Sequence, residues 1–383
     1  MFPFVVLGVA SALTLLVGSV IGHRELRAFV KVKPQTLTER LRVVIPARNE
    51  EHRIATTLAA VLQDASPLLE VVVYDDRSTD GTCRVVEHWV QKDPRVLLLR
   101  GTTDPAPGTF GKPVGLARAV EFADQQLGRH DGVWLFLDAD VTLTAGTLGG
   151  LVAVLQQEHA DALSGVPHFL NVSVIEQLVV PVITALVGMR HPPRAVHDER
   201  SSMAFLNGQL ILVRREALDG VGGFSAVNSA VLEDVALARL LKQRGYRLRL
   251  AMLHGCAQTR MYTSWSEIRD GFSKNSVALF GGPATTFFSA LTAVVLACGP
   301  WLGLLVAVGG DDPLATAIAL VAFLTAASSQ LALRRGLRLP LWPVLVLPLA
   351  YALAAWVLLR AVMLVWTGRD VAWRGRRYRA SRH

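Results

Sequence analysis

The sequence predicts an α/β domain built on a parallel β-sheet and joined to about four transmembrane helices. Two patterns indicate this fold class. Between residues 41 and 137, short apolar runs alternate with stretches of helical periodicity, and long uncharged runs lie at both ends of the chain. At 51% hydrophobic and 18% charged, the 383-residue chain is also too apolar for an ordinary soluble protein. Because the apolar excess is concentrated in the uncharged runs, we expect these runs to lie in a membrane.

The uncharged runs are long enough to cross a hydrocarbon core, which takes roughly 20 helical residues. The first is expected to form an N-terminal anchor over residues 1–22, since it has neither a basic start nor a clear cleavage site of small residues. The others form a C-terminal membrane region over residues 275–366 and divide into runs at 275–310, 313–333 and 339–366. Arg360 is the one charged residue within the last run.

Charged residues next to these runs predict the orientation of the chain. Arg24, Arg27 and Lys274 flank the central polar segment, whereas Asp311 and Asp312 lie between the second and third runs. The positive-inside rule therefore places the polar segment in the cytoplasm, as part of a multi-pass protein of the cell membrane. Four crossings would, however, leave the basic tail over residues 367–383 outside. We therefore expect the last run, which three prolines interrupt, to be partly re-entrant or interfacial.

The polar segment begins with two strand–helix units. Leu41–Pro46 is a short apolar run typical of a strand, and Ile54, Leu58 and Val61 then recur at helical spacing. Glu70–Tyr74 predicts a second strand, and the following Ser-Thr-Asp-Gly stretch is a helix-start signal.

A third strand–helix unit and a fourth strand follow in the same order. Arg95–Leu99 predicts a third strand, Lys112-Pro113 opens a third helix with proline at a tolerated early position, and Gly132–Leu137 predicts a fourth strand. These strands are continuously apolar rather than alternating, as expected for a parallel sheet that is covered on both faces.

Unusual polar residues follow three of the predicted strands. Ala47-Arg48-Asn49-Glu50 follows the first strand, Asp75-Asp76 the second, and Asp138-Ala139-Asp140 the fourth. Ligands of such sheets bind outside the carboxyl ends of the strands, so these residues should meet in one crevice. Asp138 and Asp140 would project from the same side if the extended geometry persists, and two carboxylates held together need a positive partner. The alternative is a polar strand end lying in water.

With these residues in place, the chain resembles the family 2 glycosyltransferases of the GT-A fold. The resemblance covers about Leu41–Leu250 and implies a GT-A domain over residues 38–274. Any one of its motifs is weak alone, but their joint order and spacing are specific. The matching stretches are VVIPARNEE, VVVYDDRSTDGT, GKPVGLARAV, LFLDADV, FLNGQLILVRREALDGVGGF and VLEDVALARLLKQRGYRL.

The resemblance implies a role for each matching position. Asp76 would hydrogen-bond the uracil ring of a nucleotide-sugar donor, and Lys112 would lie near its ribose and diphosphate. Asp138 would face the ribose or the sugar, and Asp140 would bind a divalent cation, Mn²⁺ or Mg²⁺, that carries the diphosphate. Asp234 matches the catalytic base. The neighbouring nucleotide wall would consist of Pro46, Ala47, Asn49 and Glu50.

General chemistry supports these roles independently. A diphosphate leaving group needs its charge neutralised, hard oxygen ligands suit Mg²⁺ and Mn²⁺, and the metal acts as a Lewis acid on the leaving oxygen. A general base that takes the acceptor's proton opposite the leaving group predicts a single displacement with inversion. The alternative for Asp234 is an exposed carboxylate without a catalytic role, in the first turn of a helix, where negative charge is favoured anyway.

Some residues depart from the family pattern. Processive members carry a Gln-x-x-Arg-Trp motif after the base, and the corresponding region, Gln258–Ser276, lacks it. Its Arg-Met-Tyr run is similar to membrane glycosyltransferases that modify carotenoids, hopanoids and similar lipids. Arg260 either stabilises the leaving diphosphate or is an arginine at the membrane surface. Arg77 replaces a common glycine and is read as a surface arginine or a phosphate contact. His254 is read as structural or as a further metal ligand.

The predicted function is a hexosyltransferase that moves one sugar from a UDP-sugar, with UDP-glucose as the default, to a membrane lipid acceptor such as a carotenoid or hopanoid. An apolar stretch over residues 172–189 is either an interfacial helix lining the entry of the acceptor or a buried core helix. The alternatives are a processive polysaccharide synthase and a catalytically inactive nucleotide-binding membrane scaffold. The basic tail argues for contact with anionic lipid rather than nucleic acid, and the three cysteines form no metal or disulfide pattern.

Overall fold

The computed structural model describes residues 1–373 and 376–379, which form two compact units. The sheet unit consists of Phe29–Leu170 and Pro193–Met261. The helical unit consists of Met1–Ala28, Asn171–Pro192 and Tyr262–His383. The chain therefore passes between the units several times, and the region predicted as one GT-A domain contributes two segments to the helical unit.

The sheet unit contains the predicted parallel strands at the centre of its larger sheet. Strands β2 (Leu41–Ala47), β3 (Leu69–Asp75), β4 (Val96–Arg100) and β5 (Val133–Leu137) lie in the order β5-β2-β3-β4, all parallel. Val43 of β2 pairs with Val71 of β3 and with Leu135 of β5. The prediction from four apolar runs is therefore confirmed, and the polar residues that follow β2, β3 and β5 lie at one edge of the sheet.

Four strands that the apolar runs did not predict extend this sheet beyond β5. Strand β9 (Leu210–Arg214) is antiparallel to both β5 and β7 (Ala162–Val166), and β10 (Leu248–Met252) and β1 (Val30–Lys31) complete the order β1-β10-β7-β9. The sheet is consequently mixed rather than wholly parallel. A smaller sheet has the order β6-β11-β8, from β6 (Val141–Leu143), β11 (Ala257–Thr259) and β8 (His168–Phe169).

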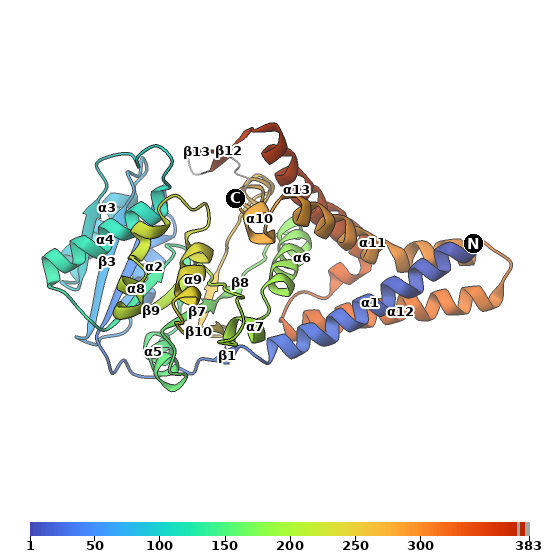
Figure 1. Ribbon diagram of the computed structural model, residues 1–383, viewed down its shortest axis with the longest axis horizontal. Helices are drawn as coiled ribbons and strands as arrows, with labels where there is room; N and C mark the ends of the chain where they lie inside the picture. The colour runs from blue at the N-terminus through green and yellow to red at the C-terminus, as the bar shows by residue number, and fades with distance from the viewer. Residues whose placement is uncertain (374–375, 380–383) are drawn as a thin grey trace. The chain divides into compact units, whose positions relative to one another are not determined.

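Helices cover both faces of the large sheet, which explains the continuously apolar strands. On β2, Val43 and Ile45 pack into one core cluster and Val44 into the other, and all three are fully buried. Helices α2 (Ile54–Leu62), α3 (Thr82–Lys92) and α5 (Thr147–Gln157) supply the first cluster, whereas α4 (Gly111–Leu127), α8 (Arg215–Gly220) and α9 (Glu233–Gln243) supply the second (Figure 1). The short α7 (Pro193–His197) and the 3-10 helix η1 (Gly223–Val227) connect these elements.

The helical unit contains four candidate membrane spans within the described residues. They are α1 (Phe2–Leu26), α11 (Pro283–Val308), α12 (Pro313–Gly336) and α13 (Leu347–Thr367), the last preceded by the 3-10 helix η2 (Trp342–Val346). The run predicted over residues 275–310 is interrupted, because Gly281 and Gly282 adopt φ of 81° and 134° and end α10 (Trp265–Phe280) before α11 begins. Strands β12 (Asp370–Trp373) and β13 (Arg376–Arg379) follow α13.

Small residues bring α1 and α11 into close, antiparallel contact (Figure 1). A Cβ added to Gly8 would lie 3.2 Å from the carbonyl oxygen of Gly299, and one added to Gly303 would lie 3.0 Å from that of Phe4. Glycines four residues apart allow such backbone approach between membrane helices. Helix α12 runs parallel to α1, since Gly336 at its end lies beside His23. The carboxyl ends of α1 and α12 and the amino end of α11 therefore lie at one end of this bundle.

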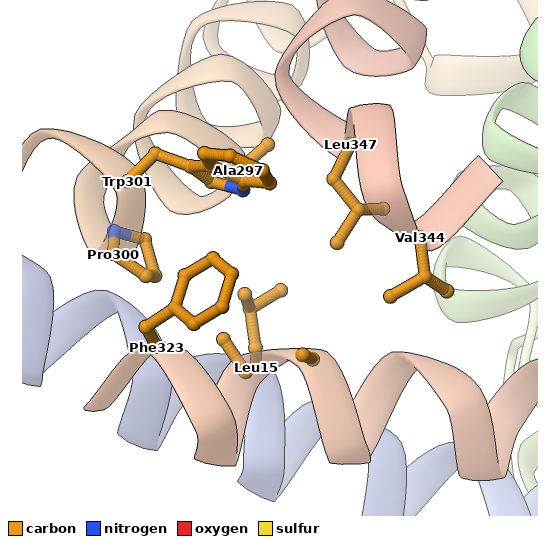
Figure 2. A pocket seen from close by; sticks show the side chains of 9 residues that line it. Leu15, Ala297, Pro300, Trp301, Phe323, Val344 and Leu347 are labelled. Atoms are coloured by element: carbon orange, nitrogen blue, oxygen red, sulfur yellow. The ribbon is translucent and has the colours of Figure 1, made fainter. Parts of the chain in front are cut away.

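Helix α13 does not run the length of the other three. Figure 2 shows Leu347, at its start, across a small apolar gap from Leu15, Pro300 and Phe323, which lie near the middle of α1, α11 and α12. Its last turn contacts the first turns of α11, where the rings of Trp366 and Phe287 lie 6.5 Å apart. Helix α13 thus begins beside the middle of the bundle and ends at the end that carries the amino end of α11.

Two further helices of this unit pack on α13. Helix α6 (Val174–Arg190) and α10 contact α13 and each other. Each begins with a capping box: the backbone N–H of Glu176 donates to the Ser173 hydroxyl, and that of Glu267 donates to the Ser264 hydroxyl. The stretch predicted as interfacial or buried over 172–189 is thus a helix that belongs to the unit containing the membrane spans.

Candidate active site

The candidate site begins at the tight turn that follows β5. The backbone N–H of Asp138 donates to the carbonyl of Gln209 at 3.0 Å, and that of Val141 donates to the carbonyl of Asp138 at 3.2 Å. The Thr57 hydroxyl of α2 donates to the carbonyl of Ala139 at 2.7 Å. Neighbouring elements thus fix the backbone that carries Asp138 and Asp140.

Lys112, in the first turn of α4, is the cation that joins the carboxylates of this site. Its Nζ lies 2.7 Å from Oδ1 of Asp138 and 3.0 Å from Oε1 of Glu233, and it donates to the carbonyl of Gly208 at 3.1 Å. Burial lowers the pKa of Lys112, but the charges of Asp138 and Glu233 outweigh that effect and raise it, so the ammonium stays charged. Lys112 therefore links β5 to α9.

Asp234 lies in the first turn of α9, held by two backbone amides. Its Oδ2 accepts from the N–H of Gly208 at 2.7 Å and its Oδ1 from that of Val235 at 2.8 Å. Burial and the neighbouring charge of Glu233 raise its pKa to about 7, while Lys112 and the amides act in the opposite direction. A carboxylate with this pKa takes up and releases protons near neutral pH, as a general base must.

Asp140 differs from Asp234, because one of its carboxylate oxygens makes no hydrogen bond. Its Oδ1 is buried and makes no hydrogen bond. Burial and the charge of Asp138 raise its pKa to about 7, although Arg53 and Lys112 partly offset this. A buried carboxylate oxygen without a partner fits a cation ligand. In the part of the chain that the structure describes, no three His, Cys, Asp or Glu side chains converge to hold a metal, so a cation here would take oxygen ligands from a bound molecule as well.

Arg260 reaches the same end of the sheet through the small sheet. Strand β11 is antiparallel to β6, with Thr259 opposite Val141. Arg260 comes one residue after Thr259 and Asp140 one residue before Val141, so the two positions are neighbours across the ladder. The register thus places Arg260, which carries a guanidinium group, next to Asp140, whose Oδ1 makes no hydrogen bond.

The predicted nucleotide wall is formed by two loops tied to each other. Pro46 and Ala47 end β2 opposite Tyr74 and Asp75 of β3, and the N–H of Asp76 donates to the carbonyl of Ala47 at 2.8 Å. Side chains also join the two loops. The N–H of Asn49 donates to the Ser78 hydroxyl at 3.0 Å, and the N–H of Glu50 donates to the Thr82 hydroxyl at 2.8 Å. Asp76 and Glu50 are both buried.

The two ambiguous residues of the sequence also lie in the sheet unit. His254 packs edge-on against His168, with ring centroids 4.9 Å apart. Arg77 adopts the left-handed region with φ of 55° and pairs with Asp104, while its Nε is buried without a hydrogen bond. Nε of Arg77 also lies 4.0 Å from Oδ1 of Asp76, so Arg77 adjoins the predicted nucleotide wall.

Sequence reasoning missed Glu233 and Gly208. Glu233 is buried against Lys112, and a Cβ added to Gly208 would lie 2.7 Å from Oδ2 of Asp234. The Glu-Asp pair was visible in the sequence, but only one of two adjacent carboxylates could be matched to a role. The need for glycine at position 208 arises from a residue 26 positions away, which no local pattern reveals.

Comparisons with known proteins agree with this fold. The model of the glycosyltransferase-like family 2 matches residues 39–269. The 4,4'-diaponeurosporenoate glycosyltransferase of Staphylococcus aureus (strain USA300) is 27% identical over 282 residues, covering 70% of this chain and 68% of the relative. The same enzyme of strain bovine RF122 is 28% identical over 237 residues, covering 61% of this chain and 59% of the relative.

A solved structure is similar in fold. The mannosyltransferase PcManGT from Pyrobaculum calidifontis, in complex with GDP-Man and Mn²⁺, has a TM-score of 0.54 at 20% identity and covers 94% of this chain and 98% of its own. The mixed α/β core is thus that of the GT-A glycosyltransferases. Because the family model matches more than half of its residues, the chain belongs to the glycosyltransferase-like family 2 and is a glycosyltransferase.

Proposed function

We propose that this protein is a membrane-bound, metal-dependent, inverting glycosyltransferase that moves a single hexose from a UDP-sugar to a lipid acceptor. The observation that carries the proposal is the unpartnered buried oxygen of Asp140, two residues from an Asp138 that Lys112 already neutralises. The remaining negative charge needs a cation, and a cation that also binds a diphosphate completes the site.

The donor is proposed to bind across the ends of β2, β3 and β5. Asp76 and the wall of Pro46, Ala47, Asn49 and Glu50 are assigned to the uridine. Lys112 and Arg260 are assigned to the diphosphate and Asp138 to the ribose or sugar, because an ammonium and a guanidinium match phosphate oxygens. Asp140 is assigned to the divalent cation, Mn²⁺ or Mg²⁺. The Mn²⁺ in the complex of the mannosyltransferase of similar fold supports a divalent cation.

The reaction follows from these assignments. The acceptor oxygen attacks the anomeric carbon, the bond from that carbon to the diphosphate oxygen breaks, and the nucleoside diphosphate leaves with the electron pair. Asp234 takes the proton of the attacking hydroxyl, and its pKa of about 7 suits that transfer near neutral pH. A bound divalent cation would supply Lewis-acid stabilisation of the leaving oxygen. One displacement with the base opposite the leaving group inverts the anomeric centre.

A lipid acceptor is proposed because the catalytic fold is joined to membrane helices in one chain. The helical unit contains the four candidate spans together with the helices α6 and α10. The Staphylococcus aureus relative, named for 4,4'-diaponeurosporenoate, supports an apolar acceptor of the carotenoid type. A single transfer is favoured over polymer synthesis because the chain lacks the Gln-x-x-Arg-Trp motif.

The membrane arrangement is proposed to be three crossings and one re-entrant segment. Helices α1, α11 and α12 are long enough to cross, whereas α13 starts beside the middle of that bundle and returns. Arg24, Arg334 and Arg335 lie at the end to which α13 returns, and the acidic α11–α12 loop lies at the other. The positive-inside rule then places the catalytic domain and the chain after α13 in the cytoplasm.

The function is tested by measuring release of UDP or GDP from nucleotide sugars by the purified protein in lipid nanodiscs. UDP- and GDP-sugars are supplied one at a time with Mn²⁺ or Mg²⁺, with and without a lipid extract. We expect turnover with one UDP-sugar that the extract stimulates, and its loss in Asp140→Ala and Asp234→Asn. Asp131→Asn is the matched control, since its side chain is exposed. Binding without turnover in any extract would contradict the proposal, as would turnover with GDP-sugars alone.

A further inference from the structure

A polar cluster joins α10 to α13 inside the otherwise apolar helical unit. Asp270 of α10 forms ion pairs with both Arg269 and Arg360: its Oδ2 lies 2.7 Å from Nη2 of Arg269, and its Oδ1 lies 3.1 Å from Nη2 of Arg360. Arg360 is the only charged residue of α13. Two guanidinium groups therefore share one carboxylate at this contact.

The charges at this contact do not balance. On α10, the acidic Glu267 and Asp270 are matched by the basic Arg269 and Lys274. Helix α6, which also packs on both helices, adds Glu176 at its start and Arg190 at its end, again one of each sign. Counted over α6, α10 and α13, the side chains therefore carry one positive charge more than negative charges, and the extra charge is that of Arg360. Such a charge is costly unless an anion accompanies it.

Several polar atoms at the same contact are buried without partners. Nη1 of Arg360 is buried and donates no hydrogen bond, and the hydroxyl oxygens of Ser273 and Ser276 are buried and unbonded. Ser273 and Ser276 are almost wholly buried, with exposed fractions of 2% and 0%. Oδ1 of Asn275, on the same helix, is likewise buried without a hydrogen bond. Buried polar groups are normally paired, so four such groups on one helix pair indicate missing partners.

The positions of these groups on the helices bring them together. Ser273 lies three residues after Asp270 and four before Val277 on α10, so it falls between them on one face. Asp270 pairs with Arg360, and Val277 packs against Ala361 and Val365 of α13. The Ser273 hydroxyl therefore lies on the face of α10 that packs on α13, within one turn of the Arg360 pair.

We propose that this cluster binds the oxyanion of an amphiphile, a carboxylate or a phosphate whose apolar tail lies among the membrane helices. The free Nη1 of Arg360 and the hydroxyl of Ser273 are donors, and an oxyanion accepts from both while balancing the positive charge. A neutral lipid would leave the charge uncompensated. Nothing in the proposed glycosyl transfer assigns this site, which lies in the helical unit and uses none of the residues of the candidate active site.

The site is tested by titrating the full-length protein, in an uncharged maltoside detergent at pH 8.5, with oleate, methyl oleate and phosphatidylglycerol. Native mass spectrometry counts the bound molecules. We expect one oleate or one phosphatidylglycerol to bind saturably and methyl oleate not to bind. Preference for oleate would identify a carboxylate-bearing amphiphile as the occupant, and preference for phosphatidylglycerol a membrane phosphate. Equal binding of methyl oleate and oleate would overturn the proposal.

Substitutions at Arg360 and at a control arginine test where the oxyanion binds. Arg360→Gln is expected to weaken binding at least about tenfold, as loss of a charge-assisted hydrogen bond does. Arg335→Gln is the matched control, because Arg335 is an exposed arginine of a neighbouring helix, and it should bind like wild type. Unchanged binding in Arg360→Gln would contradict the site.

Ser273→Ala keeps the test decisive if Arg360→Gln fails to fold. Removing a buried, unbonded hydroxyl should raise the Tm of the ligand-free protein and weaken binding severalfold. A residue with only a packing role would raise the Tm without changing binding, which would overturn its assignment. Asp140→Ala should leave oleate binding intact. If glycosyl transfer persists while no oxyanion binds the wild-type protein, this inference fails and the proposed function stands.

Discussion

The candidate active site and the α10–α13 contact differ in the sign of the charge that they leave unbalanced. In the active site, the carboxylates of Asp138, Asp140, Glu233 and Asp234 gather around one Lys112 ammonium. In the helical unit, two guanidinium groups share the one carboxylate of Asp270. The proposed ligand is therefore a cation in the first arrangement and an anion in the second.

This difference shows how each unit is prepared for a ligand. The active site meets part of its charge with fixed groups, since Asp234 accepts from two backbone amides and Asp138 pairs with Lys112. The helical contact offers hydroxyl groups and a guanidinium nitrogen that have no partner. Under these proposals, one cation at Asp140 completes the active site, whereas the ligand of the helical cluster supplies the hydrogen bonds that Arg360 and Ser273 lack.

The largest effect is expected from removing the base. Asp234→Asn keeps the shape of the side chain but cannot take a proton, so the kcat for transfer should fall by about 10²–10⁴-fold. Donor binding should be little changed, because Asp234 is held by backbone amides and is not assigned to the donor. Steady-state release of UDP gives kcat, and calorimetric titration with the UDP-sugar gives affinity. A kcat within threefold of wild type would show that another group accepts the proton.

The second-largest effect is expected from removing the Lys112 ammonium, which pairs with the carboxylates of Asp138 and Glu233. Lys112→Gln should raise the KM for the donor by about 10–100-fold, because an ammonium assigned to the diphosphate is lost. It should also move the acidic limb of the pH profile of kcat/KM to higher pH, since Lys112 holds down the pKa of Asp234. Loss of folding alone would lower activity without moving the pH profile. A profile that moves to lower pH would contradict the arrangement.

A smaller loss is expected from displacing Asp234 without changing its chemistry. In Gly208→Ala, the new Cβ would lie 2.7 Å from Oδ2 of Asp234, which must then move from the Gly208 amide. We expect kcat to fall by about 10–100-fold, the cost of a misplaced catalytic group. Gly188→Ala, where a Cβ meets nothing within 4 Å, is the control for an added methyl group without a close contact. Equal activity of Gly208→Ala and wild type would show that the close approach does not position the base.

The smallest effect is a change of stability with pH in the metal-free protein. The pKa of Asp140 is about 7 in the folded state, above the ordinary value of about 3.9 for an unfolded aspartate. The folded protein therefore binds more protons than the unfolded chain between these values, and stability should fall as pH rises from about 4 to 7. The Tm should drop by several degrees over that window, and less in Asp140→Asn. Mn²⁺ with UDP should restore the Tm at pH 8, and a wild-type Tm that rises with pH would contradict this.

The local part of the fold was predictable, and the long-range part was not. The four apolar runs predicted β2, β3, β4 and β5 because a strand buried on both faces needs no other signal. The reversal at β9 was not visible, since a five-residue apolar run reads the same in either direction along a sheet. In the same way, prolines indicated that the last membrane run would be irregular, but its starting point beside Phe323 depends on contacts between distant helices.

The residues of the candidate site show the same difference between local and long-range signals. Asp138, Asp140 and Asp234 were identified because each lies in a motif with neighbours in sequence, and their roles remain predictions. Glu233 was seen only as a neighbour of Asp234, because its contact with Lys112 spans more than 100 residues. The serines of α10 looked like ordinary polar residues of an amphipathic helix, and only their burial without partners distinguishes them.

The central claim, that the active site is completed by a cation at Asp140, is tested most directly by electron paramagnetic resonance of Mn²⁺. Mn²⁺ is titrated at pH 8 into wild-type protein and Asp140→Asn, each with saturating UDP, and free and bound metal are distinguished by their spectra. We predict one Mn²⁺ bound per wild-type chain and a loss of affinity of at least about tenfold in Asp140→Asn. Equal binding by the two proteins would contradict the account.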